Sequence, residues 1–231
     1  MFVAVKFRTL ASVMLIVLMI AGIAVFPKSK SSETLSANKR YTLVIDAGHG
    51  GRDGGAVAES GLKESEVNLE IALKMRDLAA FLGLDSVLTR ETDTDFADGG
   101  NYSEHDNLVK RAELANRTPN AVLISVHQNN YPSALVKGAE VMYSLNNQSK
   151  ELGLIAQDNF VTYLDRENRR VAHPAPENLL LTSSVNCPAI LAECGFMSNP
   201  EEAQKLATDA YTSKIALILI SSYVQFADKS Y

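Results

Sequence analysis

Two histidines, His49 and His127, each follow a short apolar run at the point where the chain becomes small and polar. Such a run is typical of a buried strand entering a loop, so each imidazole is expected at the carboxyl end of a strand. A third run, residues 188–192, delivers the carboxylate of Glu193 in the same way. Sites in open α/β sheets form at this edge. Two imidazoles and a carboxylate there suggest a metal centre.

A fourth polar group comes from a predicted helix over residues 64–82. Its apolar residues recur at three- and four-residue steps, as in an amphipathic helix: Val67, Ile71, Met75, Leu78 and Leu82. Glu64 lies within about 60° of every member of this stripe, whereas Glu66 and Glu70 are rotated roughly 140° and 100° from its centre. The helix dipole favours an acid here but does not explain its inward direction. With no Lys or Arg in the stripe, a metal cation such as zinc could neutralise Glu64.

Together these residues resemble the zinc-dependent N-acetylmuramoyl-L-alanine amidases of bacterial cell walls, a family with a Gly-His-Gly-Gly start and a Glu-x-Gly-Phe end. The similarity runs in family order from about residue 42 to the C-terminus. The matching pieces are residues 46–56, Glu64 with Asn68, Thr89-Arg90, Arg111, residues 125–129 and residues 193–199.

The resemblance implies that His49, Glu64 and His127 bind one Zn²⁺ per chain, while Glu193 acts on the substrate. This division fits a hydrolytic zinc site, which keeps three protein ligands and one open position. The metal would polarise the amide carbonyl and lower the pKa of water, and Glu193 would move the proton to the leaving amine. The implied substrate is the peptidoglycan amide between the lactyl group of N-acetylmuramic acid and L-alanine. The residues alone reach only metal-assisted amide hydrolysis.

Three further polar residues belong to the matching motifs. Arg90 is predicted to bind an acidic part of the substrate. Asn129 is predicted to contact substrate, although its amide could equally orient a ligand loop. Arg111 lies in a predicted helix, and we expect it to pair with a buried carboxylate such as Asp46.

The remaining histidines and the two cysteines have simpler interpretations. His105 and His173 lie in polar or Pro-containing stretches and are predicted to be surface residues. Cys187 and Cys194 flank an extended strand, so their Cα atoms would be roughly 20 Å apart, too far for a disulfide. Strand alternation turns Cys194 away from Glu193, so it is predicted to pack in the core.

Asn130 departs from the family pattern, in which the position after Asn129 is usually small, commonly alanine. It adds an amide beside the predicted metal site. We expect substrate fit to differ there.

The N-terminus is predicted to direct export. Lys6 and Arg8 precede an apolar stretch, residues 10–26, that would span about 25 Å as a helix. Residues 22–24 could form a cleavage site, but an uncleaved anchor with the catalytic domain outside the membrane is favoured. The predicted organisation is a signal peptide or anchor over 1–26, a linker over 27–40 and a catalytic domain over 41–231.

Composition narrows the partners. The 22 basic and 27 acidic residues give a net charge of −5, without a basic stripe, which argues against nucleic acid and tight binding to anionic wall polymers. No repeat or second composition block appears, so one catalytic domain is expected. An activating protein partner leaves no signature in the sequence.

The pattern of elements predicts an α/β fold, with a mostly parallel mixed sheet of five or six strands, helices on both faces and the zinc site at its carboxyl edge. Two irregular stretches, 91–104 and 171–179, are candidate walls of a substrate groove. The expected strands are residues 41–46, 86–89, 121–126, 139–143 and 189–193, and the expected helices are residues 64–82, 107–115, 149–164 and 211–227.

Three functional alternatives stay open within this picture. The short leader and single domain look similar to spore-cortex germination amidases, although general wall amidases share the motifs. A zinc exopeptidase would use a similar edge, but its co-catalytic form needs more carboxylate ligands than the motifs supply. An inactive glycan-binding domain is disfavoured because all four chemical groups are present.

Overall fold

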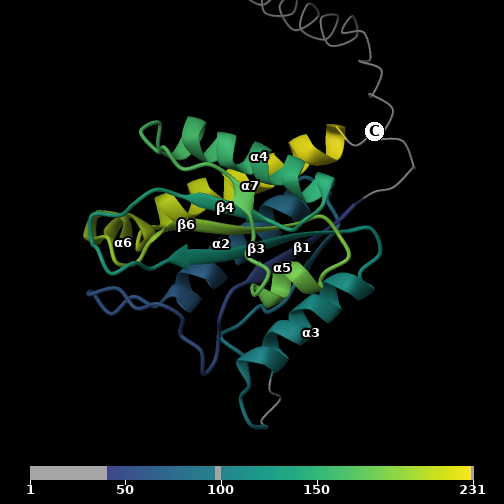
Figure 1. Cartoon of the computed structure of the whole chain (residues 1–231), viewed down its shortest axis with the longest axis horizontal. Helices are drawn as coiled ribbons and strands as arrows, with labels where there is room; N and C mark the ends of the chain where they lie inside the picture. Colours follow the sequence, from purple (N-terminus) through teal and green to yellow (C-terminus); the bar gives the residue numbers. More distant parts are fainter. Residues whose placement is uncertain (1–40, 97–99, 230–231) are drawn as a thin grey trace, which may run out of the picture. The chain divides into compact units, whose positions relative to one another are not determined.

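The computed structural model describes residues 41–96 and 100–229 (Figure 1). The predicted leader and linker, residues 1–40, lie outside the described residues. Six strands form one sheet in the order β2-β1-β3-β6-β4-β5. Their bounds are β1 Thr42–Ala47, β2 Ser86–Leu88, β3 Ala121–Asn129, β4 Glu140–Tyr143, β5 His173–Pro174 and β6 Ala189–Phe196.

The sheet is mostly parallel, as predicted. β1 runs parallel to β2 and β3, and β3 runs parallel to β6. β4 is antiparallel to β6 and parallel to the short β5. The carboxyl ends of β1, β3 and β6 therefore meet at one edge, where His49, His127 and Glu193 are found.

Helices cover both faces of the sheet (Figure 1). One face carries α2 (Glu64–Phe81), α4 (Asn147–Asn159), the π-helical turn η1 (Phe160–Leu164) and α7 (Asp209–Lys229). The other carries α3 (Glu104–Arg117) and α5 (Leu180–Ser184), while α6 (Pro200–Leu206) follows β6 and contacts α7. The predicted α/β architecture is confirmed.

Alternation along the strands decides which groups reach the site. On β3, Val122, Ile124 and Val126 are buried in the core shared with α2 and α7, whereas Leu123 is buried against α3 and α5. His127 continues the second series, because side chains two residues apart share a face. Glu193 has the same orientation, since it stands in register with His127. Both groups thus project on the α3 and α5 side.

The structure corrects several predicted bounds. β3 continues to Asn129 and β6 to Phe196, because the two strands keep pairing beyond a register shift near His127. The predicted helix over 149–164 becomes α4 and η1, and α3 begins at Glu104, where the Ser103 hydroxyl accepts from the Asp106 N–H. The elements α5, α6 and β5 were not predicted.

Within residues 41–96 and 100–229, no helix is long and apolar enough to cross a bilayer.

Candidate metal centre and active site

Three side chains converge at the carboxyl edge of the sheet. His49, Glu64 and His127 each offer a ligand atom, and the three atoms lie within 4.8 Å of one another. Glu64 Oε1 stands 3.2 Å from His49 Nε2 and 3.0 Å from His127 Nδ1. Residues from β3, the loop after β1 and the start of α2 thus share one small volume.

The loop after β1 brings its backbone close to this volume. His49 has a φ of 60°, a left-handed conformation that is uncommon for residues other than glycine. A Cβ at Gly48 would lie 2.3 Å from His127 Nε2, so a larger residue here would collide with the second imidazole. Glycine at position 48 is required by this close approach.

Asp53 holds the ring of His49. Its Oδ2 lies 2.7 Å from His49 Nδ1, and its Oδ1 accepts from the N–H of Gly55 at 3.0 Å. Tyr102 also hydrogen-bonds to Asp53. A carboxylate on one ring nitrogen fixes the tautomer and leaves the other nitrogen free for a metal. Sequence reasoning gave Asp53 no role, although an acid four residues after His49 was a signal.

The start of α2 fixes Glu64. No side chain caps this helix at Lys63; instead, the N–H groups of Glu64 and Ser65 donate to the carbonyl oxygens of Ala56 and Gly54. The carboxylate accepts from the N–H groups of Ala56 and Gln128 and from the amide of Asn68. Glu64 is 3% exposed, which confirms the predicted inward direction.

These contacts on Glu64 leave its carboxylate fixed in position. Oε2 accepts from the Ala56 N–H at 2.9 Å, and Oε1 from the Gln128 N–H at 3.0 Å and from Asn68 Nδ2 at 3.3 Å. Backbone donors on both oxygens favour the ionised form. Glu64 is therefore a charged carboxylate in a fixed orientation rather than a surface acid.

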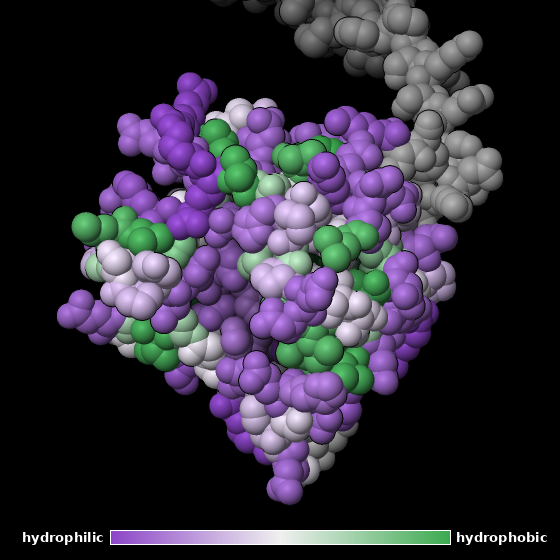
Figure 2. Space-filling model, viewed as in Figure 1, coloured by the Kyte–Doolittle hydropathy of each residue, from purple (hydrophilic) through white to green (hydrophobic). Residues whose placement is uncertain are grey.

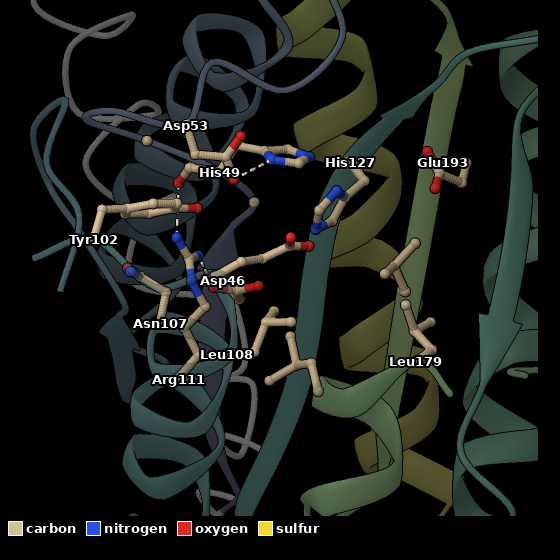
Figure 3. A pocket seen from close by; sticks show the side chains of 15 residues that line it. Asp46, His49, Asp53, Tyr102, Asn107, Leu108, Arg111, His127, Leu179 and Glu193 are labelled. Atoms are coloured by element: carbon tan, nitrogen blue, oxygen red, sulfur yellow. Dashed lines mark hydrogen bonds and ion pairs between the residues drawn. The ribbon is translucent and has the colours of Figure 1, made fainter. Parts of the chain in front are cut away.

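Glu193 lies beside this cluster in a pocket of about 250 Å³. Its Oε2 is buried and has no hydrogen-bond partner among the described residues. Figure 3 shows Asp53, His49, His127 and Glu193 in a row, with Leu108 and Leu179 below them. The molecular surface is hollowed near the middle of the face shown in Figure 2, and hydrophilic residues line the hollow. Glu193 therefore faces open space and has a carboxylate oxygen able to accept a hydrogen bond from a reacting group.

Both irregular stretches singled out in the sequence contribute to this pocket. Tyr102 and Glu104 come from the first, and Leu179 ends the second. Residues 171–178 do not line this pocket, so the prediction that the stretch 171–179 forms a wall of the groove holds only for Leu179.

Charges in the site shift the pKa values of its members. Burial disfavours the imidazolium of His49, but Glu64 and Asp53 outweigh this effect and raise its pKa to about 9. Burial likewise disfavours the Glu64 carboxylate, yet hydrogen bonds to His127 and His49 hold its pKa well below the usual range. For Glu193, burial dominates and raises the pKa to about 7. With a pKa of about 9, His49 carries a proton at neutral pH when no metal is bound.

We expect metal affinity to depend on pH because of this proton. Below about pH 9, the raised pKa keeps His49 protonated, so a metal must displace the proton from Nε2. The apparent Kd for zinc should rise about tenfold for each pH unit by which the pH falls between pH 8 and pH 6. Competition with a chromogenic chelator measures this slope. The exposed His105 provides the control, since His105→Ala should leave the slope unchanged; a constant Kd over this range would contradict the expectation.

Arg111 and Asp46 form a buried ion pair beside the loop after β1, residues 48–53, which carries His49 and is called the metal loop below. Arg111 Nη1 donates to Asp46 Oδ1 at 2.5 Å and to the Ala47 carbonyl at 2.7 Å, and Nη2 donates to the His49 carbonyl at 2.7 Å. Ser125 donates to the second Asp46 oxygen. Burial opposes ionisation of Asp46, but Arg111 and Ser125 hold its pKa below normal. The structural role predicted for Arg111 is confirmed.

Arg90 does not have the environment predicted for it. It is 5% exposed, and its guanidinium donates to the carbonyl oxygens of Ala47, Gly48, Ser65 and Thr92. A side chain with these contacts is not available to an acidic substrate. The geometry makes Arg90 a support of the metal loop, and the predicted substrate contact is withdrawn.

Asn129 lies at the end of β3 and does not line the pocket that holds Glu193. Its side-chain oxygen accepts from the N–H of Asn130. This contact supports the loop-orienting alternative, while direct contact with substrate stays a prediction.

The other histidines and the cysteines do not belong to the cluster of His49, Glu64 and His127. His105 is exposed on α3, and the partly exposed His173 pairs with Glu140 at 3.3 Å. Cys187 and Cys194 are free thiols, and Cys194 is buried in the core shared with α2 and α7. These predictions are confirmed.

The donor set fits zinc. Two imidazole nitrogens and one carboxylate oxygen match a hydrolytic zinc site with an open position. Among the residues that the structure describes, this is the one group of three or more His, Cys, Asp or Glu side chains placed to hold a metal ion. A co-catalytic exopeptidase would need further carboxylate ligands, so that alternative is not supported.

Comparison with known proteins agrees with this chemistry. A family model described as N-acetylmuramoyl-L-alanine amidase matches residues 43–221. The germination-specific N-acetylmuramoyl-L-alanine amidase of Bacillus subtilis is 33% identical over 189 residues, covering 80% of this chain and 78% of that protein.

Solved structures show the same similarity. The CwlD amidase from Clostridioides difficile, solved in complex with the GerS lipoprotein, is 31% identical with a TM-score of 0.76, covering 82% of this chain and 99% of that one. The amidase AmiC2 of Nostoc punctiforme is 27% identical with a TM-score of 0.72, covering 82% and 98%.

Proposed function

Because this chain belongs to the N-acetylmuramoyl-L-alanine amidase family, which acts on peptidoglycan, we propose that it is a zinc enzyme of the bacterial cell wall or spore cortex. In this proposal, His49, Glu64 and His127 hold the metal and Glu193 handles the proton. One observation carries it: three ligand atoms lie within 4.8 Å of one another, and two of their residues, His49 and His127, line the pocket of Glu193, whose buried Oε2 has no partner among the described residues.

The chain's own groups divide the chemistry between them. When bound, zinc supplies Lewis acidity toward the amide carbonyl and lowers the pKa of water. Glu193 accepts the proton of the attacking water and donates it to the amine of L-alanine as the amide breaks. Its pKa of about 7 suits both directions of transfer. Asp53 and Arg111 keep His49 in place through its ring and its carbonyl.

The substrate is proposed to be spore cortex. Support comes from the B. subtilis relative, whose name describes it as germination-specific, at 33% identity. We expect cortex to be cleaved faster than vegetative wall.

Export and a protein partner complete the proposal. Residues 1–26 would direct the chain out of the cytoplasm as a signal peptide or anchor. Residues 27–40 would connect this segment to the catalytic domain, residues 41–231. Peptidoglycan is extracytoplasmic, which supports this arrangement. The CwlD neighbour was solved with the GerS lipoprotein, and a lipoprotein partner for this chain is proposed on that likeness alone.

Mass spectrometry of digested peptidoglycan tests the function. The purified protein should release stem peptides with a free N-terminal alanine, chelator should abolish the release and added zinc should restore it. Glycan fragments with intact lactyl-alanine bonds would contradict the amidase activity. Release that resists the chelator would contradict the zinc proposal, and equal rates on cortex and vegetative wall would contradict the cortex preference.

A further inference from the structure

Two buried amide side chains, Asn68 on α2 and Gln128 on β3, are hydrogen-bonded to each other. Asn68 is fully buried and Gln128 is 3% exposed. Gln128 Nε2 donates to Asn68 Oδ1 at 3.1 Å, so the two side chains join the helix to the strand, and we call them the amide pair. Burying an amide is costly unless its polar atoms are hydrogen-bonded. The other contacts of the pair therefore show what it holds in place.

The amide of Asn68 bonds to two of the segments that carry proposed ligands. Its Nδ2 donates to Glu64 Oε1 at 3.3 Å and to the carbonyl oxygen of Gly48 at 3.2 Å. Gly48 directly precedes His49, and Glu64 lies one turn before Asn68 on α2. A single side-chain nitrogen thus holds both a ligand carboxylate and the backbone next to a ligand imidazole.

Gln128 connects the third ligand segment to the pair. It directly follows His127 on β3, and its backbone N–H donates to Glu64 Oε1 at 3.0 Å. Its side chain also sets the direction of the Asn68 amide, because the donor Nε2 faces Oδ1 and leaves Nδ2 toward Glu64. Gln128 Oε1 is buried without a hydrogen-bond partner among the described residues. An amide kept here despite that unpaired oxygen indicates that its nitrogen donor is needed.

Other donors share the acceptors of the amide pair. Arg90 Nη2 donates to the Gly48 carbonyl at 3.1 Å, and the Ala56 N–H donates to Glu64 Oε2 at 2.9 Å. Both contacts would persist if the side chain of Asn68 were replaced by an apolar one. Removing the amide pair should therefore weaken metal binding without abolishing it.

We propose that the amide pair positions the segments that carry all three ligands, so that the site is assembled before the metal binds. The inference rests on the proposed zinc function. Asn68 and Gln128 are positioning residues in it, because they act through Glu64 and the Gly48 carbonyl and not on the substrate. Ligands that are already in place lose less conformational freedom when the ion binds. Groups that orient metal ligands typically contribute about 10- to 100-fold to metal affinity.

Apolar replacements of similar size test the amide pair in the full-length protein. Asn68→Leu removes the donor to Glu64 and Gly48 and should raise the Kd for zinc about 10- to 100-fold. Gln128→Met keeps its backbone bond to Glu64, loses the side-chain donor and should raise the Kd about tenfold. Competition with a chromogenic chelator measures both values. Cobalt gives a second readout, since its visible spectrum reports ligand geometry and should differ from wild type in both variants.

Gln157→Leu is the matched control for a general loss of stability. Gln157 on α4 is 6% exposed, and its amide bonds to the Val141 N–H at 2.9 Å and to the Ala139 carbonyl at 3.1 Å. Its replacement should lower the midpoint of urea denaturation about as much as Asn68→Leu does, yet leave the Kd and the cobalt spectrum unchanged. An equal rise of Kd in this control would overturn the inference.

A double variant tests whether the two amides act together. Because Gln128 acts through Asn68, adding Gln128→Met to Asn68→Leu should raise the Kd by no more than about twofold. Effects that multiply, or a wild-type Kd in both single variants, would contradict the pair and leave the zinc function standing. If Asn68→Leu does not fold, Gln128→Met alone decides. A wild-type protein that binds no zinc would contradict the proposed function itself.

Discussion

Replacing Glu193 by glutamine is expected to lower kcat for hydrolysis of the muramyl-alanine amide by about 10²- to 10⁴-fold, the usual contribution of a general acid–base group. Glutamine has the same shape but cannot accept a proton at neutral pH. Because His49, Glu64 and His127 are untouched, zinc should bind with an unchanged Kd. Chromatography of released peptide gives kcat, and elemental analysis gives the zinc content.

Two variants separate proton transfer from metal binding and from general charge effects. His49→Ala should lose both zinc and turnover, because it removes one of three ligands. Glu140 stands opposite Glu193 on β4, and Glu140→Gln should keep turnover within a few-fold of wild type. A Glu193→Gln enzyme with near-normal kcat would remove this residue from the reaction.

The second large effect concerns stability. Arg111→Met should lower the free energy of unfolding by about 3–5 kcal/mol, because it leaves the Asp46 carboxylate buried without its partner. Such a loss is a large share of the roughly 5–15 kcal/mol that stabilises a typical protein. Urea denaturation of the metal-free protein, monitored by circular dichroism, measures it.

A double variant and a matched control sharpen this test. Asp46→Leu with Arg111→Met replaces the ion pair by apolar groups and should recover much of the stability. Zinc should nevertheless bind more weakly than in wild type, since the carbonyl oxygens of Ala47 and His49 no longer have their donor. Arg117→Met, at the exposed end of α3, should change the free energy by less than about 0.5 kcal/mol. An Arg111→Met protein as stable as this control would contradict the expectation.

The sequence was informative wherever a local pattern carries the information. Helical spacing gave α2 within one residue of its observed end and turned Glu64 inward. Strand alternation separated Glu193 from Cys194. Periodicity depends on neighbours along the chain, so it can be read without the fold.

Features that depend on distant segments were missed. Residues 127–129 are polar and resemble a loop, but pairing with β6 extends β3 through them. The short α5 has too few turns for a periodic signal. Arg90 was placed against substrate because nothing nearby in sequence shows that carbonyl oxygens of three separate segments converge on its guanidinium. Such convergence exists only in the folded chain.

The hydrogen bonds at the start of α2 tie the first turn of the helix to the position of the Glu64 carboxylate. The carbonyl oxygens of Gly54 and Ala56 begin the helix, and the Ala56 N–H holds the carboxylate of Glu64. An insertion or deletion between residues 54 and 64 would therefore shift the helix and the ligand together. Substitutions in the later turns of α2 leave these bonds in place, whereas a change of length before the helix would displace both its first turn and the carboxylate of Glu64.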